Sequence, residues 1–155
     1  MGTLLFLMLG MSTAYATPRW GIESGMSASA GPYLGLVYLA DSMVASLSGS
    51  YINTTLNDDR TLTSVTAYGA VRSSLGNEVS LALGGVVGTT FGKYLGQDVA
   101  GSWHLGPSVT LEKTLSPNLI LYFDLVPIAF SHLAGPMTQD ATAIGEFSVG
   151  IYWLM

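Results

Sequence analysis

Charged residues are scarce in this chain of 155 residues, and their scarcity excludes several classes of protein. Asp, Glu, Lys and Arg make up only 10% of the residues, whereas an average soluble domain has roughly 25%. The net charge is −5, and the few basic residues are scattered, which argues against binding nucleic acid. The absence of cysteine excludes disulfides, thiol catalysis and cysteine-ligated zinc. We expect no metal or other cofactor.

Long apolar runs and helical periodicity are missing as well. Although 49% of the residues are hydrophobic, no apolar run reaches the roughly 20 residues that a spanning helix needs. The chain instead alternates with a period of two. Its last segment, GEFSVGIYWLM, places Glu146, Ser148 and Gly150 on one face and, on the other, Phe147, Val149, Ile151 and Trp153. Such alternation predicts a strand with one apolar and one polar face.

Eight alternating segments separated by turn residues predict eight β-strands. They span residues 20–29, 33–40, 43–53, 62–73, 78–91, 102–113, 119–131 and 142–154. Lengths near ten residues suit tilted strands that cross a bilayer. Short connectors alternate with the longer loops 53–61, 92–101 and 132–141, except that the first connector on the long side is also brief. Outer-membrane barrels have this pattern, and their short turns face the periplasm.

The predicted fold is therefore all-β: an eight-stranded antiparallel up-and-down transmembrane β-barrel formed by residues 17–155. The aromatic residues on the outward faces support it, because they fall into two girdles at the membrane interfaces. Trp20 and Trp153 belong to the periplasmic girdle, and Tyr51, Phe91 and Trp103 to the outer one. A soluble calyx of the lipocalin type, with the faces reversed, is the competing fold. The scarcity of charge and the polar inward faces speak against it.

The N-terminus predicts export from the cytoplasm. MGTLLFLMLGMSTAYA has an apolar stretch followed by the small-residue pattern Ala14-Tyr15-Ala16, which is typical of a secretory signal peptide cleaved after residue 16. No Lys or Arg precedes the apolar stretch, so the signal is atypical, and a buried N-terminal helix or strand is the alternative. With the barrel, a signal peptide over residues 1–16 predicts localisation in the outer membrane of a Gram-negative-type envelope.

The lumen of the predicted barrel collects ionisable side chains. The inward parity carries Glu23, Arg72, Glu112, Asp124 and Glu146. Four buried carboxylates cannot all stay charged beside one guanidinium, so some are expected to be protonated, hydrated or paired with a cation. A polar network around Arg72 that plugs the lumen is the leading interpretation. A narrow proton or cation path is the alternative.

Two histidines lie near the outer rim. His104 opens the sixth predicted strand and His132 closes the seventh, next to Ser131. Ester hydrolysis uses a histidine with a serine and a carboxylate. His104, His132 and Ser131 are therefore weak catalytic candidates. Ser131 and His132 are consecutive, however, and consecutive strand residues face opposite ways. We assign no catalytic residue, and two histidines alone make a poor metal site.

The strand periodicity, the girdles and the closing GEFSVGIYWLM resemble the small eight-stranded outer-membrane barrels, the class of the OmpA transmembrane domain and OmpX. The resemblance implies contact with outer-membrane lipids and lipopolysaccharide, and assembly through the C-terminal strand by the barrel-assembly machinery. Family members usually end in Phe or Trp, where this chain has Met155. We expect a monomer with a structural or surface-interaction role that presents its long loops.

A second resemblance is to lipid A deacylases of the same barrel size. In that family a histidine and a serine two residues apart, near the end of strand seven, carry catalysis. The corresponding stretch here is AFSHLAGPM, in which Ser131 and His132 have the wrong order and spacing. This departure counts against a lipid A-modifying enzyme, which stays an alternative function.

Overall fold

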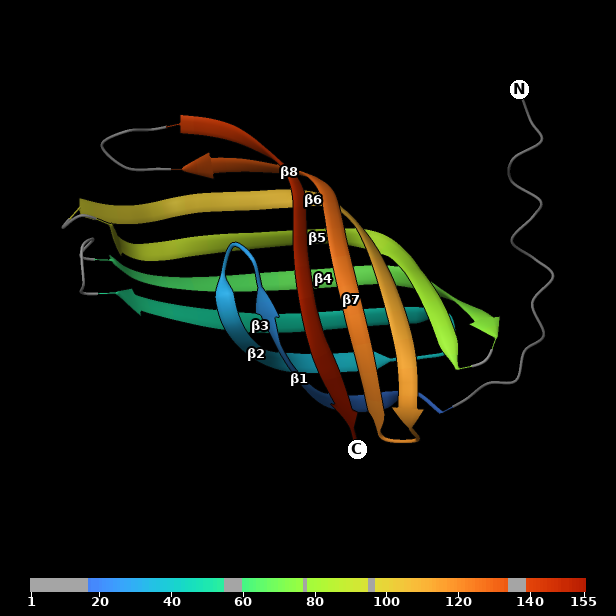
Figure 1. The fold of residues 1–155 in the computed structure, drawn as a ribbon. Coiled ribbons are helices and arrows are strands. Elements are labelled where there is room, and N and C mark those ends of the chain that lie inside the picture. Colours follow the sequence, from blue (N-terminus) through green and yellow to red (C-terminus); the bar gives the residue numbers. More distant parts are fainter. Residues whose placement is uncertain (1–16, 55–59, 77, 95–96, 134–138) are drawn as a thin grey trace, which may run out of the picture.

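The described residues fold into one closed β-barrel and contain no helix. The computed structural model describes residues 17–54, 60–76, 78–94, 97–133 and 139–155. The strands are β1 (Arg19–Ser27), β2 (Gly31–Leu39), β3 (Met43–Thr54), β4 (Arg60–Gly76), β5 (Val79–Tyr94), β6 (Gln97–Ser116), β7 (Leu119–Leu133) and β8 (Gln139–Leu154). Each pairs antiparallel with the next, and β1 pairs with β8 (Figure 1). The predicted fold is confirmed, whereas the predicted signal peptide, 1–16, lies outside the described residues.

The outer surface is apolar, as the alternation predicts. Large apolar side chains on every strand point away from the lumen, among them Leu34, Leu47 and Phe123, which are 63%, 56% and 47% exposed. Their neighbours on the polar parity point inward and are buried, for example Glu23 and Glu112. A surface of this kind is stable only against hydrocarbon. No helix among the described residues is long and apolar enough to span a membrane.

The two predicted girdles lie on the outward face. Trp153 pairs with Ile22, which is two residues along β1 from Trp20. The Trp20 ring packs edge-on against the Tyr38 ring, and their centroids are 5.1 Å apart. Tyr51, Phe91 and Trp103 project outward nearer the other end of the barrel. The end with Trp20 and Trp153 also carries the short β2–β3, β4–β5 and β6–β7 turns, so it is the periplasmic end.

The strands on the outer side are longer than the sequence predicts. The predicted loop 92–101 is wrong, because β5 runs to Tyr94 and β6 begins at Gln97, with Lys93 paired to Asp98. Gly92 has φ of +135° and lies at a register shift between β5 and β6. The shift is a β-bulge with its extra residue on β6, because the three steps from Ser102 to Val99 match the two steps from Thr90 to Gly92. A bulge bends a strand without ending it. The loop 132–141 is likewise shorter, since β7 ends at Leu133 and β8 begins at Gln139.

A second irregularity exchanges the faces of the outer halves of β7 and β8. On β7 the odd-numbered Leu121 and Phe123 face lipid, but beyond Pro127 the even-numbered Ile128 and Phe130 do so. On β8, Gly145 lies opposite Pro127 and has φ of +75°. Proline cannot donate to the ladder and glycine tolerates the left-handed conformation. The alternation is therefore reset by one residue at this point.

The wall of the barrel has unequal height. A turn over residues 28–30 joins the end of β1 to the start of β2. The pairing of β1 with β8 stops at the same level, at Ser27 opposite Ser148. β3 to β8 continue past this level, and Figure 1 shows the blue β1–β2 hairpin ending well short of the green and yellow strands. No described strand therefore pairs with residues 140–146 of β8 on the side of β1. We call these residues the β8 edge.

The lipid-facing belt gives a direct test of the fold. Leu47 lies midway along the outward row of β3 and is 56% exposed. A charged residue at the middle of a membrane-barrel wall costs about 2–4 kcal/mol. We expect Leu47→Arg to lower the free energy of unfolding by that amount, measured by urea unfolding in lipid vesicles. Ser42→Arg, in the exposed β2–β3 turn, is the matched control and should leave the stability unchanged. Equal stability of the two variants would contradict the lipid-facing assignment.

Candidate functional site: an acidic cavity in the lumen

The periplasmic end of the lumen is filled by apolar side chains. This floor is a cluster of buried residues, Val37, Leu39, Val44, Ile120, Tyr152 and Leu154. Val37 and Leu39 point inward as the parity of β2 requires, although apolar residues are unexpected in a polar lumen. The ends of β2, β3, β7 and β8 bring them together, so their burial closes the barrel at the end where β1 begins and β8 ends.

An ion pair lies in the lumen near the floor. Arg72 on β4 donates from Nε to Oε2 of Glu112 on β6, and the Glu112 side chain is 1% exposed. A buried carboxylate needs such a partner because desolvating a lone charge is costly. Arg72 therefore serves Glu112, while the other three predicted lumen carboxylates lie elsewhere.

Hydroxyl groups serve two of the remaining carboxylates. Tyr122 donates to Oε1 of Glu23 at 3.4 Å, and since its only hydroxyl hydrogen is used there, Tyr33 donates to Tyr122. The result is a chain of three groups from β2, β7 and β1 across the lumen. The Tyr122 ring also stacks on Tyr152 with centroids 4.3 Å apart. This layer rests directly on the floor.

A second chain of hydroxyls ends at Asp124. Ser108 and Thr110 on β6 both donate to Oδ1 of Asp124 on β7, each at 2.6 Å. Thr110 thereby uses its only hydrogen, so Tyr68 donates to Thr110 over 2.7 Å. Two adjacent strands and one across the lumen are tied together in this way, and the carboxylate is held in a fixed orientation.

Glycines on neighbouring strands make room for the inward rings. Gly25 pairs with Tyr33 and Gly150 pairs with Tyr122, each directly across the ladder. A Cβ at Gly25 would lie 2.4 Å from the Tyr33 hydroxyl oxygen, and one at Gly150 would lie 2.6 Å from that of Tyr122. Each ring therefore lies over the backbone of a residue without a side chain. Eight strands leave an interior only wide enough for side chains, so this pairing is a condition of closure.

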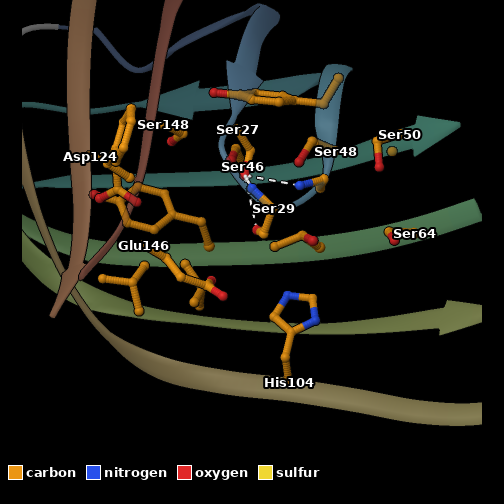
Figure 2. A pocket seen from close by; sticks show the side chains of 18 of the residues that line it. Ser27, Ser29, Ser46, Ser48, Ser50, Ser64, His104, Asp124, Glu146 and Ser148 are labelled. Carbon is orange, nitrogen blue, oxygen red and sulfur yellow. Dashed lines mark hydrogen bonds between the residues drawn. The ribbon is translucent and has the colours of Figure 1, made fainter. Parts of the chain in front are cut away.

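Tyr33, Tyr68 and Tyr122, together with Tyr152 of the floor, form what we call the tyrosine layer. Above this layer the lumen opens into a cavity of about 310 Å³. Serines are the most frequent lining residues, and β3 contributes the most of them, Ser46, Ser48 and Ser50, which Figure 2 labels. The opposite wall presents Asp124, Glu146 and His104 to the same space (Figure 2). Glu23 lines the base. The predicted lumen residues thus divide: Arg72 and Glu112 lie near the floor, and the other three carboxylates face the cavity.

The reset of alternation at Pro127 decides where the rim residues point. His132 lies outward, stacks on Trp103 with centroids 5.9 Å apart, and hydrogen-bonds through Nδ1 to Asp140 at 2.7 Å. Ser131 lines the cavity directly opposite His104 in the ladder. The hydroxyl of Ser131 donates to the carbonyl oxygen of Ala141, at 3.4 Å. The weak catalytic candidates are therefore split between two faces of the wall.

The tyrosine layer is the part of the site that sequence reasoning missed. Tyr33, Tyr68, Tyr122 and Tyr152 all occupy inward parity, which the strand pattern already fixed. For Tyr33 and Tyr122 the signal was the glycine on the neighbouring strand, but finding it requires the register between strands. Strand parity alone gives the face of a residue and not its partner.

The fold is shared with solved bacterial barrels. Neisserial surface protein A (NspA) superposes with a TM-score of 0.57 at 14% identity, covering 88% of this chain and 94% of that one. Outer membrane protein H (OprH) from P. aeruginosa, solved in DHPC micelles, gives 0.61 at 12% identity, covering 90% of this chain and 100% of that one. No protein-family model matches this chain, and no curated protein matches it. The likeness establishes the small outer-membrane-barrel fold, and the apolar belt agrees with the predicted outer-membrane localisation.

The glycine–tyrosine pairing can be tested by adding one methyl group. At Gly150 a Cβ would lie 2.6 Å from both the Ser24 carbonyl oxygen and the Tyr122 hydroxyl, whereas at Gly69 no atom lies within 4 Å. We expect Gly150→Ala to destabilise the barrel by about 1–3 kcal/mol because of overpacking. Gly69→Ala should change stability by less than about 0.5 kcal/mol. Urea unfolding in vesicles measures both, and equal effects would show that the ring does not occupy the space over Gly150.

Proposed function

We propose that this chain is a monomeric outer-membrane barrel that acts at the cell surface by binding an extended segment of another protein along the β8 edge. The carrying observation is the unequal height of the wall, which leaves residues 140–146 of β8 paired with β7 alone. Outer-membrane lipids, including lipopolysaccharide, are the proposed surroundings of the apolar belt. The barrel-assembly machinery is proposed to recognise the chain through β8.

An unpaired strand edge has a defined chemistry. It presents a row of backbone N–H and C=O groups, and an added strand can satisfy them. The usual protections against such pairing are lysine, proline and inward-pointing charge. The β8 edge carries no lysine or proline, and its inward-pointing charge, Glu146, lies at the end nearest β1. Ile144 in its centre is 84% exposed. These features favour pairing with a partner strand.

The floor of the lumen argues against the alternative of a narrow proton or cation channel. Val37 and Val44 are fully buried there, and Leu154 is 2% exposed. An ion that crossed this layer would have to leave its water without receiving a polar replacement. Likewise, the outward His132 has Asp140 as its partner while Ser131 faces the lumen, so the geometry does not favour a lipid A hydrolase.

Electrical recording distinguishes a closed barrel from a channel. We expect the protein in planar bilayers to produce no conductance steps, because the floor excludes water from the periplasmic end. Protein from the same preparation should run as a compact band on an SDS gel that shifts on boiling, which shows that folded barrels were added. Steps that are altered by Asp124→Asn would contradict the closed floor and favour the cation path.

Blocking the β8 edge tests the surface role. Arrays of short unstructured peptides would be probed with the barrel in detergent, and we expect bound sequences with alternating β-branched residues. Ile144→Lys and Thr142→Pro should each lose most of this binding, because lysine and proline oppose strand addition. Both residues are exposed, so the barrel should stay folded.

Ser42→Lys adds the same charge at the periplasmic end and is the control. If the edge variants bind the same peptides as the unchanged chain, the β8 edge is not the binding surface. The absence of any bound peptide would overturn the proposal itself.

A further inference from the structure

The cavity in the lumen is acidic, and His104 is the one basic side chain among the described residues that line it. Among the described residues that line it are Glu23, Asp124 and Glu146, but no Lys or Arg. Arg72 is engaged with Glu112 nearer the floor. The volume of about 310 Å³ falls at the lower end of the roughly 300–1,000 Å³ typical of small-molecule sites. The lining of the cavity therefore has the charge to attract a cation, and the cavity has room for a small one.

Glu23 and Glu112 each have one buried carboxylate oxygen without a hydrogen-bond partner among the described residues, and of the two only Glu23 lines the cavity. Its side chain is 5% exposed, and Tyr122 donates to Oε1. The other oxygen, Oε2, has no hydrogen-bond partner among the described residues. A buried carboxylate oxygen without a donor is unfavourable. A cationic ligand at the base of the cavity would place a positive charge beside this carboxylate and offset the cost of its burial.

The arrangement favours an organic cation over a metal ion. No three His, Asp or Glu residues in the described part of the chain are grouped so as to hold a metal ion. Tyr33, Tyr68, Tyr122 and Tyr152 also line the cavity, and aromatic rings attract ammonium groups. Serine hydroxyls along the wall can accept further N–H donors. Val86 and Val126 line the same space and suit a short aliphatic body.

We propose that the lumen cavity binds a small aliphatic diamine, with one ammonium group at Glu23 and the other toward Glu146. Glu146 lies beyond the level at which β1 ends, so it stands nearer the outer opening than Glu23 does. The ligand enters from the cell exterior and stops at the tyrosine layer, because the apolar floor lies below. This is a binding site and not a path. It shares Glu146 with the β8 edge, but the Glu146 side chain lines the lumen.

Calorimetric titration of the whole barrel tests the proposal. The detergent should be an uncharged maltoside, because phosphocholine headgroups carry an ammonium group of their own. The probes are butane-1,4-diamine, butane-1,4-diol and succinate, which share a four-carbon skeleton and differ in charge. We expect heat of binding with the diamine only. Absence of binding by the diamine, or equal binding by the diol, would overturn the proposal.

Three charge-neutralising variants locate the site. Glu23→Gln keeps the shape of the side chain and should weaken diamine binding at least about tenfold, the effect of losing one charged hydrogen bond. Glu146→Gln should also weaken diamine binding. It replaces Glu23→Gln as the test if that variant does not yield a folded, heat-modifiable barrel. Asp41→Asn removes the same charge from the exposed periplasmic turn and should bind like the unchanged chain. Equal weakening by all three would mean general charge attraction and would overturn the cavity as the site.

Discussion

Closure of the sheet is the constraint on which the rest of this structure depends. In hydrocarbon, each backbone N–H and C=O group needs a partner within the protein, and only a closed ladder gives every strand two neighbours. The pairing of β1 with β8 supplies this closure at the membrane level. It also confines the interior, because eight strands leave room for little more than side chains. The pairing of Gly25 with Tyr33 and of Gly150 with Tyr122 follows from that confinement.

Within the narrow lumen, polarity changes along the barrel axis. The periplasmic end is packed like the core of a soluble domain, with Val37 and Val44 fully buried. The middle is a hydrogen-bonded layer in which tyrosine hydroxyls and Thr110 serve Glu23 and Asp124. Only the outer part is hollow and lined with serines. A lumen of this kind can hold a ligand from outside while remaining closed toward the periplasm.

Two local irregularities determine the strand lengths and the direction of the side chains in the outer half of the barrel. β5 and β6 continue past a bulge on β6, at the level of Gly92, as a paired wall where the sequence predicts a loop. The reset at Pro127 and Gly145 turns His132 outward to Asp140 and turns Ser131 inward opposite His104. Together with the low β1–β2 hairpin, these features create the raised wall and the β8 edge. Small departures from ideal alternation thus decide which side chains meet.

The sequence by itself determined the class of fold and the faces of most strands. Alternation is a local property with a period of two, so it assigned Glu23 to the lumen and Phe123 to lipid without knowledge of any neighbour. The scarcity of charge then decided that the apolar face is the outer one. Only the tertiary structure decided which inward residues are partners, because register depends on residues far apart in the chain. The pairing of Arg72 with Glu112, the place of Tyr33 over Gly25, and the unpartnered oxygen of Glu23 all belong to that second level.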